Sequence, residues 1–322
     1  MKNIIKFAKS KFMKLLDFYK RFPDEKDCIE YLKNAKLKQG LLCKKCGNAS
    51  FYWKEDRLMF ECKKCNSRLS LKSDTIFEDS NLPIQLWFQV IHFISSTKKT
   101  FSALEIQRQL EYSNYETIWN MLHKIRWAMG ERDKKYKLDT FIEIDEGFFK
   151  VVDKKLTKEL IEENQKRGRG SINHLKVLVL VESQSVEEVL EKNKHKPNRK
   201  CGHLKMVVMD NLKADTINEE ISKNVIPETE VITDKYKGYA KLKDILKHTE
   251  INTTGMKEVH KTFPWVHSAI GNAKKIMLGF HHSIGKDYLQ SYLDEFCYKF
   301  NRRYMPDLFD RVIIACMISK KI

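Results

Sequence analysis

The chain has 322 residues, long enough for roughly two or three compact domains. Lys and Arg number 60 against 43 Asp and Glu, so the formal net charge is +17, and 42% of the residues are hydrophobic. This hydrophobic content excludes a disordered chain. The longest stretch without a charged residue, 81–97, contains Pro83, Gln85 and His92, which excludes a membrane span there. The positive excess favours a polyanionic partner, with nucleic acid first, although a solvated lysine-rich surface would give the same excess.

Residues 1–40 are predicted to form a helical N-terminal segment. In residues 1–22 lysines alternate with apolar residues at roughly helical spacing, which is typical of a short amphipathic basic helix packed on its own protein. The lysines interrupt every apolar run, so no export signal is predicted. Asp17 and the scarcity of arginine argue against a mitochondrial presequence.

Half of the eight cysteines follow a metal-binding pattern. Two Cys-Lys-Lys-Cys units follow each other in a C-x2-C-x15-C-x2-C pattern, which is the spacing of a zinc ribbon. The pattern consists of Cys43, Cys46, Cys62 and Cys65. We therefore predict a ribbon over 41–75, with two strand-like pieces at 51–53 and 58–60. A site with four thiolates is closed, so its Zn2+ is structural rather than catalytic.

Residues 76–135 are predicted to be helical, with a helix-turn-helix. Ser102 and Glu105 form a capping-box pattern that starts one short helix, and a turn at 112–115 precedes a second helix over 116–129. In a helix-turn-helix the second helix can enter the major groove of DNA. The alternative interpretation is an ordinary helical spacer.

From residue 137 the pattern becomes that of a mixed α/β domain, predicted over 137–305 and followed by a C-terminal tail, 306–322. Strands are expected at 140–145, 175–181, 204–209 and 230–234. Helices are expected at 214–224, 239–248, 266–278 and 286–304. The fold class is therefore α/β and multidomain.

Two aspartates, Asp145 and Asp234, stand at the ends of predicted strands. A carboxylate at the end of a buried strand is costly unless it is paired or bound to a metal ion. Two such carboxylates could share divalent cations of the kind that promote phosphodiester chemistry. As the alternative, both could be helix caps or turn residues. Alternation places Phe141, Glu143 and Asp145 on one face of the first strand.

A basic loop precedes the second predicted strand. It contains Lys166, Arg167 and Arg169, with a glycine after each arginine, and suits contacts with phosphate. A linker that happens to be charged would look the same.

Several motifs follow one another in a characteristic order along the chain. They are Phe22-Pro-Asp-Glu25, the two Cys-x2-Cys units, Thr75-Ile-Phe, Leu86-Trp-Phe, Ser95-Ser-Thr-Lys-Lys99, Lys124-Ile-Arg-Trp-Ala-Met129, Asp145-Glu-Gly-Phe-Phe149, Arg167-Gly-Arg-Gly-Ser171, Thr233-Asp234 with Tyr239, and Phe296 with Phe300-Asn-Arg-Arg303. Over about residues 20–310 the chain resembles bacterial insertion-sequence transposases of the ISXO type, which have a zinc ribbon and a ribonuclease-H-like DDE domain. Eukaryotic Merlin elements carry relatives.

The resemblance implies a transposase that binds the terminal inverted repeats of an insertion sequence. It implies DNA cleavage and strand transfer that depend on two Mg2+ ions, held by Asp145 and Asp234. It also implies double-stranded DNA as the partner, a homodimer or larger synaptic complex, and no membrane. The expected location is the bacterial cytoplasm, on the nucleoid, or the nucleus of a eukaryote.

The third carboxylate of the family is missing here. The helix at 266–278 has no acidic residue, and the resemblance makes Asn272 the preferred third ligand. Counting seven residues back from Lys274 gives His267 instead, and helix geometry leaves both open. Lys274 or Lys275 would contact a phosphate near the scissile bond, and Arg302 and Arg303 the DNA backbone.

Two other functions remain open from the sequence. A decayed or domesticated transposase would bind the same DNA ends as a regulator, without catalysis. A zinc-ribbon component of the transcription machinery would explain the cysteines but not the paired strand-end aspartates.

Overall fold

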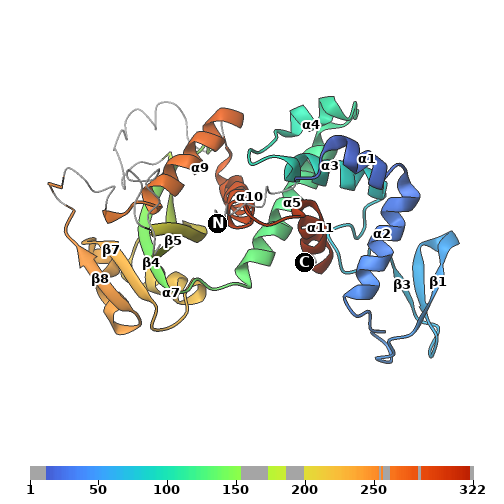
Figure 1. Ribbon diagram of the computed structural model, residues 1–322, viewed down its shortest axis with the longest axis horizontal. Coiled ribbons are helices and arrows are strands. Elements are labelled where there is room, and N and C mark those ends of the chain that lie inside the picture. Colours follow the sequence, from blue (N-terminus) through green and yellow to red (C-terminus); the bar gives the residue numbers. More distant parts are fainter. Residues whose placement is uncertain are drawn as a thin grey trace, which may run out of the picture. The chain divides into compact units, whose positions relative to one another are not determined.

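The computed structural model describes residues 12–153, 173–185, 199–253, 255–256, 262–281 and 284–319. The chain divides into two compact units (Figure 1). Unit 1 is Met1–Arg132 with Arg303–Ile322, and unit 2 is Asp133–Arg302. No helix in the described ranges combines the length and apolarity that a membrane crossing requires.

Unit 1 contains a small antiparallel sheet of three strands. They are β1 (Phe51–Lys54), β2 (Met59–Cys62) and β3 (Arg68–Ser70), in the order β1-β2-β3, with the 3-10 turn η1 (Glu55–Arg57) between the first two. The two strand-like pieces predicted from the sequence are confirmed. The third strand was not predicted, because three residues with one leucine carry too little alternation to stand out.

The rest of unit 1 is helical, with helices α1 (Leu15–Arg21), α2 (Glu25–Lys38), α3 (Ile84–Ser96), α4 (Ala103–Gln109), α5 (Tyr115–Lys134) and α11 (Leu308–Ile318). Helix α5 continues two residues into unit 2. The aromatic core joins three of these helices, because Phe309 lies 5.8 Å from Phe18 and 5.8 Å from Phe88 between ring centroids. All three rings are buried, and burial of such rings is a main source of stability.

Helix α11 replaces the tail expected over 306–322. The backbone N–H of Ile76 donates to the carbonyl of Cys316 (3.0 Å), and Phe309, Val312 and Ile313 are buried. These residues repeat at helical spacing, so the reason for the difference is visible in the sequence: the segment presents an apolar face that must be covered.

Unit 2 is built on a mixed sheet of five strands. They are β4 (Phe141–Lys150), β5 (His174–Ser185), β6 (Arg199–Met209), β7 (Glu230–Asp234) and β8 (Lys247–Ile251), in the order β6-β5-β4-β7-β8. Strands β4, β5 and β6 pair antiparallel, and β4, β7 and β8 pair parallel. This architecture confirms the predicted mixed α/β, ribonuclease-H-like fold.

Helices cover both faces of this sheet (Figure 1). Helices α9 (Val266–Phe280) and α10 (Leu289–Asn301) contribute to the core on one face, and α7 (Ala214–Asn224) with the 3-10 segment η4 (Lys237–Asp244) to the core on the other. Strand β4 alternates between the two cores: Phe149 belongs to the first, and Ile142 and Ile144 to the second. Asp145 therefore points to the face that α9 covers.

Two predicted helices differ from the structure. The stretch 239–248 was predicted as one helix, but it holds part of η4 and then β8, which pairs in parallel with β7 from Glu230↔Lys247 to Asp234↔Ile251. Pairing with a distant strand overrides local helix propensity here. The helix predicted at 286–304 begins as a 3-10 turn, η5 (Lys286–Tyr288), and α10 ends at Asn301.

Candidate functional sites

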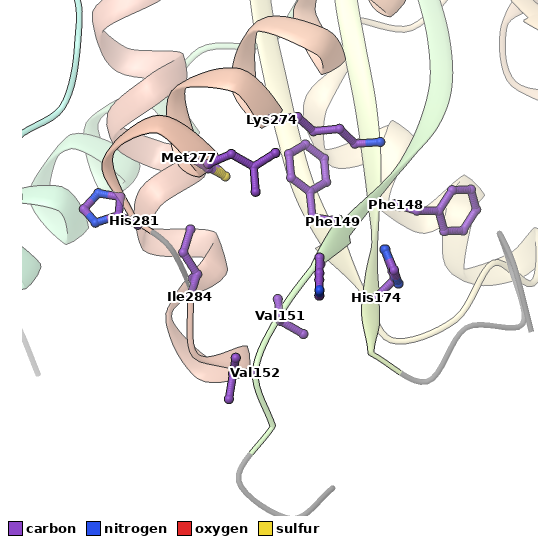
Figure 2. Close-up of a pocket in the computed structure, with 11 residues that line it drawn as sticks. Phe148, Phe149, Val151, Val152, His174, Lys274, Met277, His281 and Ile284 are labelled. Atoms are coloured by element: carbon purple, nitrogen blue, oxygen red, sulfur yellow. The ribbon is translucent and has the colours of Figure 1, made fainter. Parts of the chain in front are cut away.

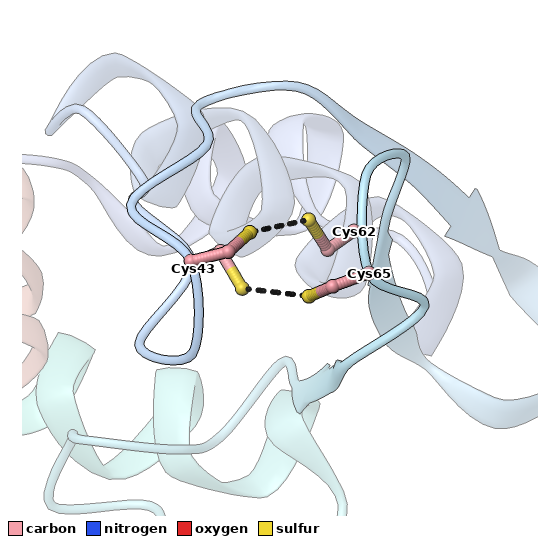
Figure 3. Close-up of side chains that lie close together, drawn as sticks. Cys43, Cys62 and Cys65 are labelled. Carbon is pink, nitrogen blue, oxygen red and sulfur yellow. Dashed lines mark hydrogen bonds between the residues drawn. The ribbon is translucent and has the colours of Figure 1, made fainter.

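The four predicted zinc ligands converge in unit 1 (Figure 3). The Sγ atoms of Cys43 and Cys65 are 3.5 Å apart, those of Cys46 and Cys62 are 3.6 Å apart, and all four lie within 4.8 Å of one another. A zinc ion bound at ~2.3 Å by four sulfurs sets them about 3.8 Å apart. The residues present therefore fit a tetrahedral Zn2+ held at the base of the small sheet.

Two matching turns explain why two residues separate each cysteine pair. The N–H of Gly47 donates to the carbonyl of Cys43 (2.8 Å), and the N–H of Asn66 donates to the carbonyl of Cys62 (3.0 Å). Gly47 and Asn66 have positive φ angles of 70° and 54°, a conformation that glycine and asparagine adopt most readily. Each turn aims both of its sulfurs at the same point.

Lys36 ties the zinc-binding sheet to α2. Its buried ammonium donates to the carbonyls of Ser70 (3.2 Å), Leu71 (3.0 Å) and Ser73 (2.6 Å), directly after β3. Burial lowers the pKa of Lys36 to about 8. No sequence pattern predicted this contact, because Lys36 is one of several lysines on α2.

Asp145 and Asp234 lie on adjacent parallel strands of unit 2. The strands pair from Phe141↔Glu230 to Glu143↔Ile232, and each aspartate follows two residues after that last pair. Both side chains therefore project from the same face of the sheet. Neighbouring paired strands lie about 4.8 Å apart. The arrangement brings together the two acidic residues that the sequence singled out.

A buried tyrosine lies close enough to both aspartates, and to Glu146, for their charges to act on it. Tyr239 is fully buried, and its pKa is raised well above the usual value by burial first and then by the charges of Glu146, Asp145 and Asp234. Three carboxylates therefore act on one hydroxyl, which stays neutral. The sequence marked Tyr239 only as part of a motif, since nothing local indicated that it would reach these residues.

His267 faces Asp145 from the first turn of α9. Its Nδ1 lies 3.3 Å from Asp145 Oδ2, with the imidazole 41% exposed. Asn272 follows five residues later, about 140° around the helix, and its side chain is exposed. The structure thus brings His267, and not Asn272, to the side of α9 that faces Asp145.

A buried glutamate holds the start of α9. Glu143 Oε2 accepts hydrogen bonds from the backbone N–H groups of Trp265 (2.9 Å) and Val266 (3.0 Å). Burial raises the pKa of Glu143, although these N–H groups and the positive charge of Arg199 act in the opposite direction. Helix N-terminal N–H groups need such an acceptor, and this one lies on the same strand face as Asp145.

Lys274 lies two turns after His267 on nearly the same side of α9. Its Nζ is 5.5 Å from the centroid of the Phe149 ring, four residues after Asp145 on β4. Lys275 is exposed on the neighbouring side of the helix. Lys274 on α9 therefore lies beside β4, near a residue four positions after Asp145.

The remaining predicted DNA contacts differ in their surroundings. Lys166, Arg167 and Arg169 lie outside the described residues. Arg302 is 7% exposed, pairs with Asp133 at 2.6 Å and stacks on Tyr298 at 3.6 Å, so its charge serves the fold, and we leave it out of the DNA surface.

Arg303 is half-buried over the exposed ring of Tyr304, with its guanidinium 4.7 Å from the ring centroid. It therefore keeps partial access to solvent, unlike Arg302.

Helices α4 and α5 follow the predicted helix-turn-helix order. Ser102 Oγ accepts from the N–H of Glu105 (3.1 Å), as the capping-box pattern predicted, and Asn114 Oδ1 accepts from the N–H of Thr117 (3.2 Å) at the start of α5. Tyr115 and Asn120 are exposed near that start. These are the positions that a recognition helix would present to DNA.

Comparison with protein families gives two matches. Residues 137–301 match the ISXO2-like transposase domain, which is more than half of the chain. Residues 23–68 match the transposase zinc-ribbon domain. No curated protein matches the chain.

Proposed function

Because the chain belongs to the family of ISXO2-like transposases, we propose that it binds the terminal inverted repeats of an insertion sequence and catalyses Mg2+-dependent DNA cleavage and strand transfer. The observation that carries the proposal is the pair Asp145 and Asp234, two residues beyond the last paired position of adjacent parallel strands. Paired carboxylates at such a place are suited to hard divalent cations.

Asp145 and Asp234 would hold two Mg2+ ions. When bound, such a pair of ions neutralises charge on the reacting phosphate and promotes ionisation of the attacking hydroxyl group. Asp145 and Asp234 would hold the ions that bind the scissile phosphate, and Lys274 would bind a neighbouring phosphate as a point charge. No tyrosine or serine nucleophile is assigned, because direct attack needs no covalent protein–DNA intermediate.

His267 is our proposed third ligand, in preference to Asn272. The support is its contact with Asp145 at 3.3 Å, whereas Asn272 lies about 140° further around α9. Neutral imidazole can ligate a divalent metal, but it favours transition metals over Mg2+. The proposal therefore predicts a metal preference that a carboxylate ligand would not give.

The zinc-binding sheet and the α4–α5 pair would bind the DNA ends. Support comes from the match to the transposase zinc-ribbon domain, the exposed start of α5 and the net charge of +17. A homodimer or larger complex would hold two ends together, since strand transfer joins both ends of an element to one target.

The test is excision and strand transfer from a donor plasmid that carries the DNA flanking the coding region. Asp145→Asn and Asp234→Asn should each lower activity by about 100-fold or more, because the charge that holds the metal is lost. Glu230→Gln is the matched control, since Glu230 is an exposed acid at the opposite end of β7. Undiminished strand transfer in Asp234→Asn would contradict the proposal.

A DNA-binding regulator without catalysis is the second candidate. It is favoured by one observation: an imidazole, and no carboxylate, faces Asp145 from α9. A regulator would bind the same flanking DNA equally with and without Mg2+ and would cut it with neither Mg2+ nor Mn2+. Cleavage with either ion excludes this candidate.

A further inference from the structure

A pocket of about 250 Å³ lies where β4 ends, beside the second half of α9 (Figure 2). Phe149 at the end of β4 and Val151 just after it line the pocket on one side, and Met277 and Leu278 line it from α9. These groups make the interior apolar. One water molecule takes up roughly 30 Å³, so the pocket has room for about eight groups of that size. A single nucleobase needs about this much space.

The polar groups that line the pocket are basic. Among the described residues, the polar lining groups are Lys150, His174, Lys274 and His281, and none of these lining residues is acidic. The pKa of His174 is lowered by burial first and then by the charges of Lys274 and Lys150, so the three basic groups face a common space. An apolar interior with a positive lining complements a flat, uncharged ring attached to an anionic backbone.

Two contacts relate this pocket to Asp145. His267 meets Asp145, and Lys274 meets the Phe149 ring, so β4 and α9 run side by side in the same direction. Four strand residues span about 13 Å and seven helix residues about 10 Å. A stacked DNA strand rises ~3.4 Å per nucleotide, so the pocket lies within about four nucleotides of Asp145.

Gly147 lies between Asp145 and Phe149 on β4 and contacts the Phe149 ring that lines the pocket. A Cβ on Gly147 would lie 2.8 Å from the edge of the Phe149 ring, so the ring folds back over this residue toward Asp145. Any larger residue would collide with the ring in this position. The glycine thus allows the ring to lie where it borders the pocket.

We infer that this pocket binds one unstacked nucleobase of the DNA strand that is cut, within about four nucleotides of the scissile phosphate, while Lys150 and Lys274 bind the flanking phosphates. The inference rests on the proposed function. Stacking of a base on an aromatic side chain tolerates any base, and such binding offsets the cost of unstacking that base from its neighbours. The rival is binding of phosphates alone, with every base left stacked.

The experiment uses the full chain and duplexes of the DNA flanking the coding region, with the fluorescent base 2-aminopurine placed at each position around the cleavage point. With Ca2+ present to prevent cleavage, one position should gain fluorescence severalfold on binding, because an unstacked base is no longer quenched. Leu278→Trp should abolish the gain by filling the pocket. Leu278 is 64% exposed, so the larger side chain should not disturb the core.

Leu278→Glu supplies a second variant, which should also abolish the gain through its negative charge. Ile245→Trp is the matched control, an added indole at a side chain 41% exposed elsewhere in unit 2, and it should keep the gain. If the wild type cleaves the duplex with Mg2+ or Mn2+ but gives no gain in fluorescence at any position, the proposed nucleobase site is overturned and the proposed function stands. A gain that persists in both Leu278 variants also overturns it. A protein that binds the duplex but never cleaves it overturns the proposed function.

Discussion

The carboxylate of Glu143 lies 3.0 Å from the backbone nitrogen of Val266, the first residue of α9. Two residues later on the same strand face, Asp145 meets His267, which follows Val266. Two consecutive contacts therefore fix the start of α9 against β4. The first contact is structural, and we expect it to set the geometry of the second.

The first prediction concerns this helix anchor. Glu143→Ala should leave two N–H groups without an acceptor and lower the free energy of unfolding by about 1–3 kcal/mol. Glu143→Gln keeps an acceptor oxygen and should lose less. Urea unfolding of both variants measures the difference, and strand-transfer assays should show that Glu143→Gln retains more activity than Glu143→Ala. Equal losses in the two variants would show that the acceptor is not what matters.

The second prediction concerns pH. Burial raises the pKa of Glu143 above its usual value of 4.5. The folded state therefore binds the proton of the Glu143 carboxyl group more tightly than the unfolded state does. The stability from this group is fully present below pH 4.5 and is lost as the pH rises through the folded-state pKa. The free energy of unfolding of the wild type, relative to Glu143→Gln, should therefore fall over that window. A flat difference from acid to neutral pH would contradict it.

The sequence predicted the parts of these sites that depend on spacing. The cysteine pattern located the zinc site, and alternation put Asp145 on the strand face of Glu143. The prediction that Asp145 ends its strand was wrong, because β4 continues to Lys150 and pairs with β5 along that stretch. Neither local pattern could reveal that Glu143 caps a helix more than 100 residues away, because such a bond depends on the packing of α9 on the sheet. Strand β8 was missed for the same reason, since its pairing with β7 is not local.

The choice between His267 and Asn272 was likewise beyond the sequence. Both positions are polar on the helical wheel, and only the contact of α9 with β4 distinguishes the side that faces Asp145. Arg302 is the opposite case, where a basic pair suggested DNA contact but tertiary packing buried one member.

The third prediction concerns zinc. The protein should bind one zinc ion per chain, and Cys62→Ser should release it and unfold the β1–β3 sheet, because metal binding supplies on the order of 10 kcal/mol of folding energy in such small modules. Metal analysis and limited proteolysis within 41–70 measure both effects. Cys201→Ala is the control, as a buried cysteine in unit 2. Retention of zinc in Cys62→Ser would exclude the four-cysteine site.

The fourth prediction separates a structural arginine from a DNA-binding lysine. Arg302→Gln should lower the free energy of unfolding by ~3 kcal/mol, since it breaks a buried pair with Asp133, and should leave the salt dependence of DNA binding unchanged. Lys275→Gln should leave stability unchanged and reduce the slope of log affinity against log salt by about 1. The reverse pattern would return Arg302 to the DNA surface.

The fifth prediction concerns the ligand on α9. His267→Ala should lower strand transfer strongly, whereas Asn272→Ala should have little effect, because only His267 contacts Asp145. With imidazole as a ligand, the wild type should be more active with Mn2+ than with Mg2+. His267→Glu should shift the preference toward Mg2+, since it supplies a hard oxygen ligand at the same position.

Titration of activity with each ion measures this preference, as the ratio of rates with Mn2+ and Mg2+ at saturation. Asn272→Glu is the matched control, because it adds the same carboxylate to the same helix on the side away from Asp145, and it should leave the ratio unchanged. A ratio that responds to Asn272→Glu but not to His267→Glu would transfer the ligand role to Asn272. The contact between His267 and Asp145 would then serve only to hold α9 against the sheet.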